Sequence, residues 1–272
     1  MTTLINIMTG NLNLNMGQMK IFGYDGADVK RLRELIAVVP QFDTFFDDMT
    51  VEEHLTLVAR LHHTNRNLIE GFCKEKAEVV GLSHDVFKRK ASVLSGGQKR
   101  RLTLGMALMS QPRLLFLDEP TTCLDPETRF AIWDIVKRVQ KEMSILITTH
   151  SMEEADALCT RIAIMTSQEL QCIGDQVELK NKFGKGFLLL LSFAPEIRNA
   201  VEYVKFKICP DVEFLETKAN IYSFTIMKDR VDLSKLLVTI MDMQRSNIIT
   251  YWSINESSLS DVFEKICKVE EQ

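Results

Sequence analysis

The chain has 272 residues, enough for one large domain or for a medium-sized domain followed by a small one. Hydrophobic residues make up 46% and charged residues 26%, as in ordinary soluble domains, and a net charge of −4 argues against a general nucleic-acid binder. Six scattered cysteines without a CxxC pair argue against disulfides and zinc sites, and no apolar run approaches the roughly 18–20 residues that span a membrane.

The first forty residues predict a short helix followed by strands. Residues 1–10 have the pattern of a helix closed by a C-cap glycine. A short strand over 19–23 and a charged helical turn over 29–35 follow. The apolar run over 36–41 predicts a buried strand, and because its proline stops the ladder, Gln41 is expected at the strand's carboxyl end.

The next segment is helical throughout. Thr50–Glu53 has the form of a capping box, and apolar residues continue with helical spacing to Leu61. A second helix is predicted over about 68–80. The pair His62-His63 has no further ligand at metal spacing, which favours a surface pair over a metal site.

Leu94–Gln98 places a hydroxyl and two glycines directly before a helix predicted over 98–110. Glycines let backbone N–H groups approach an anion, and the helix N-terminus adds favourable partial charge. Alone, this segment equally fits a flexible turn. The basic run Lys99–Arg101 that follows is predicted to be a solvated helix face.

The apolar run Leu114–Leu117 predicts a buried parallel strand that ends in Asp118, Glu119 and Pro120. Ligands of open α/β sheets bind at that edge. One carboxylate can hold a hydrated Mg²⁺, and the next can orient a water against a phosphoryl group. By itself, the pattern also fits a strand that ends in a solvated turn.

A helix and a second buried strand come next. Asp125, with proline and an acid after it, predicts the N-cap of a helix that runs to about residue 141. The strand over 144–149 ends in His150, at the edge expected for Asp118 and Glu119. Ser151–Glu154 is a further capping box.

The remaining residues predict a separate small domain. A hairpin over 161–173 and a short helix from Asp175 complete a first domain of residues 1–185, and 186–272 form the second, with a linker at 184–186. No catalytic constellation occurs in the second domain, which favours an interaction or regulatory module. Its predicted order is βαββαβ, a ferredoxin-like unit, over 187–194, 195–206, 212–217, 220–227, 231–244 and 247–254, with a final helix over 257–267.

These segments together resemble the ATP-binding-cassette (ABC) ATPases. Leu94–Gln98 matches the signature motif, the strand ending in Asp118-Glu119 the Walker B motif, Thr122–Asp125 the D-loop, and His150 the switch histidine. Gln41 matches the Q-loop. The resemblance implies a P-loop NTPase-like α/β core with a helical subdomain over about 50–110, followed by the ferredoxin-like domain.

Four further segments look like the A subfamily of lipid exporters: Pro40–Asp43, Thr50–Leu55, His150–Ala155 and Ser258–Phe263. The resemblance implies an ATP-hydrolysing cassette that powers transport, of lipid in that subfamily, through a transmembrane domain, from the cytoplasmic side of a membrane. Bacterial drug-export cassettes share parts of the pattern, so the ATPase of a multidrug-type exporter is an alternative.

The resemblance also implies ATP and Mg²⁺ as cofactors and a head-to-tail dimer with a second cassette. Two residues would act in hydrolysis, Glu119 on the attacking water and His150 on the γ-phosphate. The nucleotide would be bound by Thr2, Thr3, Gln41 and Asp118, of which Thr2, Gln41 and Asp118 would also ligate Mg²⁺. The partner's ATP would be bound by Ser95, Gly96, Gly97 and Gln98, and Asp125 would couple the two sites.

The start of the sequence departs from the family pattern. The family's first helix follows GxxGxGKTT; Thr2 and Thr3 match the threonines, and Met1 stands in the lysine's place. The resemblance therefore implies a fragment that begins within the Walker A motif. Two other functions stay open. One is a regulatory cassette that completes a partner's ATP site. The other is a DNA-repair-type cassette, although those carry a long coiled coil between the Q-loop and the signature motif, where only about fifty residues occur here.

Overall fold

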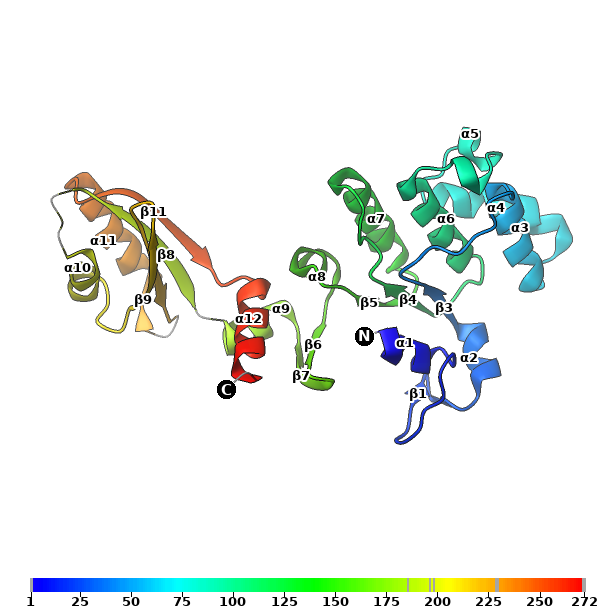
Figure 1. Cartoon of the computed structure of the whole chain (residues 1–272), viewed down its shortest axis with the longest axis horizontal. Coiled ribbons are helices and arrows are strands. Elements are labelled where there is room, and N and C mark those ends of the chain that lie inside the picture. The colour runs from blue at the N-terminus through cyan, green and yellow to red at the C-terminus, as the bar shows by residue number, and fades with distance from the viewer. Residues whose placement is uncertain (1, 185, 196, 198, 228–229, 271–272) are drawn as a thin grey trace. The chain divides into compact units, whose positions relative to one another are not determined.

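The computed structural model describes residues 2–184, 186–195, 197, 199–227 and 230–270. The chain divides into two compact units, residues 1–159 and 160–272, whose elements are labelled in Figure 1. Met1, Glu196 and Arg198 of predicted helices and Lys185 of the predicted linker lie outside the described residues. Among the described residues, no helix has both the length and the apolar character that a membrane span requires.

A three-stranded parallel sheet forms the centre of the first unit. Its order is β3 (Ile36–Val39), β4 (Leu114–Asp118) and β5 (Ser144–Thr148). Because parallel strands align their carboxyl ends, the residues that follow the three strands share one edge of the sheet. The predicted convergence of these three strand ends therefore agrees with the topology.

Helices cover both faces of this sheet (Figure 1). Phe116 packs with Ile5 of α1 (Thr2–Met8), Leu32 of α2 (Val29–Leu35) and the small hairpin β1 (Lys20–Ile21)–β2 (Tyr24–Asp25). Leu115 and Leu117 lie on the opposite pleat and join a larger core. That core includes residues of α6 (Gly96–Leu108), α7 (Pro126–Val139) and α8 (Met152–Leu158).

The segment between β3 and β4 is helical, as predicted. Thr50 caps α3 through the expected box with Glu53: its Oγ1 accepts from the Glu53 N–H at 3.2 Å, and its own N–H donates to the Glu53 carboxylate at 2.7 Å. Besides α6, the segment contains α3 (Val51–Leu61), η1 (Arg66–Leu68), α4 (Ile69–Val79), α5 (His84–Phe87) and η2 (Ala91–Val93).

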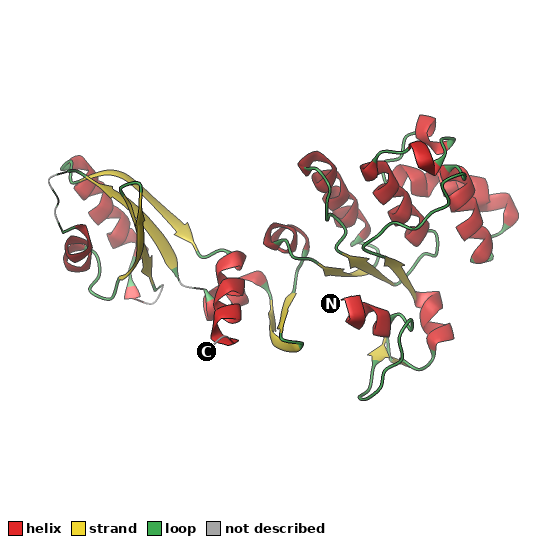
Figure 2. Cartoon of the chain, viewed as in Figure 1, coloured by secondary structure: helices red, strands yellow, loops and turns green. Residues whose placement is uncertain are grey.

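The second unit contains the predicted βαββαβ fold. The sheet order is β11-β8-β10-β9, and all three pairs are antiparallel, which confirms the ferredoxin-like prediction. Figure 2 shows its strands beside two helices, and buried side chains such as Leu189, Phe224 and Ile240 form the core between them. The elements are β8 (Phe187–Phe193), α10 (Ala200–Lys207), β9 (Glu213–Lys218), β10 (Ile221–Ile226), α11 (Leu233–Arg245) and β11 (Ile249–Glu256).

Four further elements belong to the second unit: the hairpin β6 (Ile162–Thr166)–β7 (Glu169–Gly174), α9 (Gln176–Phe183) and α12 (Leu259–Glu270). The last helix packs against α9, and Ser257 donates its N–H and hydroxyl to the Gly186 carbonyl at 3.0 and 2.9 Å. The hairpin and α9 were expected in the first domain, but they lie in the second compact unit. The predicted boundary between the two domains, at residues 185 and 186, stays a prediction.

Candidate functional site

The carboxylate of Glu119 is the centre of a cluster at the carboxyl edge of the first unit's sheet. Its Oε2 accepts hydrogen bonds from Gln41 Nε2 and Thr122 Oγ1, each at 3.0 Å. Its Oε1 lies 2.8 Å from His150 Nε2. The structure therefore brings together three predicted site residues, one from the end of each strand, and adds Thr122.

The backbone at Glu119 adopts an uncommon conformation. Its φ is +46°, in the left-handed region that a non-glycine residue seldom occupies without support from its surroundings. Here its N–H donates to the carbonyl of Thr148 at 3.0 Å and to the Thr148 hydroxyl at 3.3 Å. The neighbouring strand thus holds the turn that aims this carboxylate.

Asp118 is the last residue of β4 and is buried. One carboxylate oxygen, Oδ1, accepts a hydrogen bond from the Thr148 hydroxyl. Gln41 donates through its amide nitrogen, so its amide oxygen is the atom that could ligate a cation. A carboxylate and an amide oxygen are the hard donors that Mg²⁺ prefers, so these residues fit the expected ion.

His150 and Glu119 differ strongly in exposure. The His150 side chain is 85% exposed, whereas that of Glu119 is 17% exposed. The histidine can therefore reach a ligand that approaches from solvent, while the carboxylate behind it stays partly shielded. This arrangement suits a carboxylate that orients a water and a histidine that contacts the group under attack.

Thr2 and Thr3 lie on the exposed first turn of α1, which packs on the sheet through Ile5. Among the hydrogen bonds of the described residues, none joins either threonine to Asp118, Glu119 or Gln41. Their expected roles at Mg²⁺ and nucleotide stay predictions.

The signature segment, Leu94–Gln98, opens α6 with a full capping box. The Ser95 hydroxyl accepts from the Gln98 N–H at 3.3 Å, and the Gln98 side chain accepts from the Ser95 N–H at 3.0 Å. The two glycines have different surroundings. A Cβ on Gly96 would meet nothing within 4 Å, whereas one on Gly97 would lie 2.6 Å from a methyl carbon of Thr128 on α7. Packing against α7 therefore requires the second glycine, independently of any anion.

Asp125 caps α7, as predicted. Its carboxylate accepts from the Thr128 N–H at 2.9 Å. This hydrogen bond, with a further contribution from the Thr128 hydroxyl, holds the pKa of the carboxyl below its usual value. Asp125 is therefore ionised at neutral pH and interacts favourably with the helix N-terminus.

Sequence reasoning misassigned Arg100. The run Lys99–Arg101 was predicted to be a solvated face, but Arg100 is 4% exposed and donates to the loops after β3 and β4. The spacing of Arg100 with Leu104 and Leu108, which are also buried, could have indicated an inward position.

Sequence reasoning also missed the role of Glu154. Ser151 accepts from the Glu154 N–H at 3.3 Å, but the Glu154 side chain does not complete the expected capping box. Instead its buried Oε1 accepts from the Thr121 hydroxyl at 2.8 Å and from the Trp133 indole at 3.0 Å. This carboxylate links the helix after His150 to the loop after Glu119.

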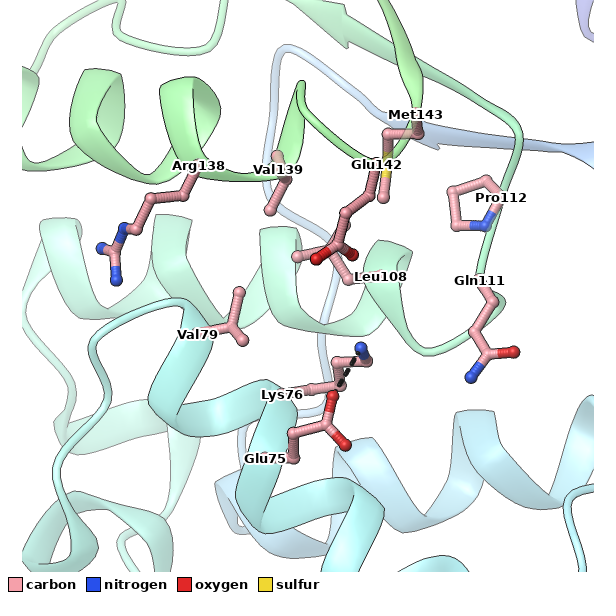
Figure 3. A pocket seen from close by; sticks show the side chains of 10 residues that line it. All are labelled: Glu75, Lys76, Val79, Leu108, Gln111, Pro112, Arg138, Val139, Glu142 and Met143. Atoms are coloured by element: carbon pink, nitrogen blue, oxygen red, sulfur yellow. Dashed lines mark hydrogen bonds and ion pairs between the residues drawn. The ribbon is translucent and has the colours of Figure 1, made fainter.

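A cavity of about 420 Å³ lies elsewhere in the first unit, where α4 and the carboxyl ends of α6 and α7 meet (Figure 3). Glu75 and Lys76 pair at 2.9 Å on one side, and Arg138 and Glu142 lie on another. Both charge signs are present, so the lining favours no ligand class. None of the predicted site residues lines this cavity.

Comparison with known proteins finds similarity to members of one family along nearly the whole chain. The family model described as "ABC transporter" matches residues 1–122. ABC transporter A family member 8 of Arabidopsis thaliana is 32% identical over 269 residues, which cover 98% of this chain and 30% of that protein. ABC transporter A family member 7 of Dictyostelium discoideum is 36% identical over 271 residues, which cover 97% of this chain and 32% of that protein. The chain thus spans about 30% of the length of these relatives.

Two solved structures share the fold. One is the dimeric post-hydrolysis state of the ATP-binding cassette MJ0796 bound to ADP and Pi, with a TM-score of 0.58 and 21% identity, covering 64% of this chain and 79% of that one. The other is described as an ATP-binding subunit of an ABC transporter, with a TM-score of 0.59 and 24% identity, covering 67% of this chain and 77% of that one. At these identities the likeness supports the fold alone.

Proposed function

Because the chain belongs to the ABC transporter family and is an ATP-binding cassette of the A-subfamily type, we propose that it hydrolyses ATP to drive lipid transport through an associated membrane domain. The observation that carries the ATPase part is the contact of Glu119 with Gln41, Thr122 and His150 at one sheet edge. The transport part is supported by the A-family transporters that align with nearly the whole chain. Lipid as the cargo rests on the resemblance of four segments to the A subfamily of lipid exporters.

In this proposal Glu119 orients the attacking water. Both oxygens of its carboxylate are held by contacts with Gln41 and His150, so the carboxylate is already oriented to accept a proton from a water. His150 would contact the γ-phosphate from its exposed position. Mg²⁺, held by Asp118, the Gln41 amide oxygen and Thr2, would neutralise charge on the phosphates.

The signature segment would act on the ATP of a second cassette. The Ser95 hydroxyl accepts one hydrogen bond from its own helix, which leaves its proton to donate to a phosphate oxygen. Gly96 lies open, so its backbone can approach a phosphate closely. The second cassette would pair head to tail with this one on the cytoplasmic side of a membrane. Pairing of two cassettes is supported by the dimeric form described for the MJ0796 cassette.

The proposal is tested by Glu119→Gln in the full-length protein that contains this sequence. The amide keeps the shape of the side chain but cannot accept the proton, so we expect kcat to fall by roughly 10²–10⁴-fold with ATP binding retained. A matched control is Glu70→Gln, which changes an exposed carboxylate on α4. Wild-type turnover in Glu119→Gln would show that the catalytic assignment is wrong.

A further inference from the structure

The side chain of Arg100 is buried and fully hydrogen-bonded. A guanidinium has five N–H donors in a planar fork. The structure supplies five acceptors: the Nε–H donates to the Pro120 carbonyl (2.8 Å), Nη1 to the Pro40 carbonyl (2.7 Å) and Asp43 Oδ1 (2.9 Å), and Nη2 to the carbonyls of Asp118 (3.3 Å) and Glu119 (3.4 Å).

These acceptors come from two loops at the same sheet edge. Pro40 and Asp43 flank Gln41 in the loop after β3. The other three carbonyls belong to Asp118, the last residue of β4, and to Glu119 and Pro120 in the turn that follows. Arg100 itself lies on α6, just over one turn after Ser95. One side chain therefore connects the signature helix with both loops that carry the predicted catalytic groups.

We infer that Arg100 is a positioning residue, which fixes the Glu119 turn against the Gln41 loop and ties both to the signature helix. This inference rests on the proposed ATPase function. A displacement of α6 by a nucleotide at Ser95–Gly97 would move the guanidinium and, with it, the carbonyls on either side of Glu119. Nucleotide bound at the signature segment would thereby affect Glu119 of the same chain.

Only arginine can make this connection. Lysine also carries a positive charge, but its three donors radiate from one nitrogen and cannot span the two loops. A role limited to the charge would be rescued by lysine, whereas a positioning role would not.

The test is steady-state ATP hydrolysis by the full-length protein with Arg100→Gln and Arg100→Lys. We expect kcat to fall roughly a hundredfold in both, the scale of an ångström-sized misplacement of a catalytic group, and KM for ATP to stay within about threefold. Arg101→Gln is the control, because Arg101 donates from the same helix to the Gly81 carbonyl and reaches neither loop. Equal kcat losses at positions 100 and 101, or full rescue by lysine, would overturn the inference.

A double variant separates positioning from folding. If Arg100 acts through the Gln41–Glu119 contact, Arg100→Lys should cause little further loss when Gln41 is already Ala, whereas independent effects would multiply. If the Arg100 variants do not fold, Asp43→Asn tests the positioning role from the other side of the Arg100–Asp43 ion pair. It keeps the shape and weakens one charge-assisted bond, so kcat should fall about fivefold. An unchanged kcat there would refute the inference, and an inactive wild type would instead refute the proposed function.

Discussion

The two larger sheets of this molecule differ in strand direction, and the parallel one brings polar groups together at one edge. In the first unit, β3, β4 and β5 run parallel, and Gln41, Glu119 and His150 follow their carboxyl ends and meet. In the second unit every pair is antiparallel, so the residues that follow neighbouring strands lie at opposite edges. Strand direction therefore decides whether the residues that follow neighbouring strands meet at one edge.

The largest expected effect comes from a substitution in the core of the second unit, far in sequence from the residues at the carboxyl edge of the first unit's sheet. Phe224 is fully buried and packs against Phe214, with ring centroids 5.7 Å apart. Phe224→Ala should lower the free energy of unfolding of this unit by about 3–5 kcal/mol. Hydrogen exchange measured on peptides should show lost protection over 187–256, with peptides around Gln41 and Glu119 unchanged.

The matched control is Ser223→Ala, on the opposite pleat of the same strand, where we expect a change within about 0.5 kcal/mol. Equal loss of protection in both units would mean that the antiparallel sheet supports the carboxyl edge of the parallel one.

The next effect concerns the two glycines of the signature segment. A methyl on Gly97 would press against Thr128, so Gly97→Ala should destabilise the first unit by about 1–3 kcal/mol, as other overpacking changes do. Gly96→Ala meets open space and should leave stability nearly unchanged. Urea denaturation of both variants measures the difference, and equal midpoints would contradict the packing role.

Local signals allowed much of the fold to be predicted. The capping residues Thr50, Asp125 and Asp175 and the prolines at positions 40 and 120 act on their own neighbours, so the sequence contains both partners of each interaction. The convergence of Gln41, Glu119 and His150 also followed, because parallel strands bring their carboxyl ends to one edge.

The features that were missed depend on partners distant in the sequence. Arg100 is buried because five acceptors from two other loops surround it, and no local pattern specifies them. The Glu154 side chain accepts hydrogen bonds from Thr121 and Trp133 in place of the local capping-box bond. The requirement for glycine at position 97 comes from Thr128, on another helix.

A smaller effect concerns the charge at the start of α7. Hydrogen bonds from Thr128 lower the pKa of Asp125 in the folded chain, so its contribution to stability is present above the unfolded pKa of about 3.9. That contribution is lost as the pH falls through the lowered pKa of the folded state. The wild type should therefore exceed Asp125→Ala in Tm at pH 7, and the gap should close in strong acid. Asp134→Ala, on the same helix, is the control, and a gap that persists in acid would contradict the role of the charge.

The smallest effect uses one cysteine from each unit. Cys123 lies in the loop after Glu119 with φ of +62°, a left-handed conformation that favours glycine, and its side chain is exposed. Replacing it by glycine relieves the backbone and loses few contacts, while the greater freedom of glycine in the unfolded chain offsets part of the gain. We expect Cys123→Gly to stabilise the first unit by about 0.5–1 kcal/mol. Cys172 lies in the extended strand β7 of the second unit, where glycine weakens a strand, so Cys172→Gly should destabilise that unit. Opposite shifts of the two denaturation midpoints would show that the loop after Glu119, unlike the hairpin of β6 and β7, holds a strained backbone. Shifts of the same sign would show that it does not.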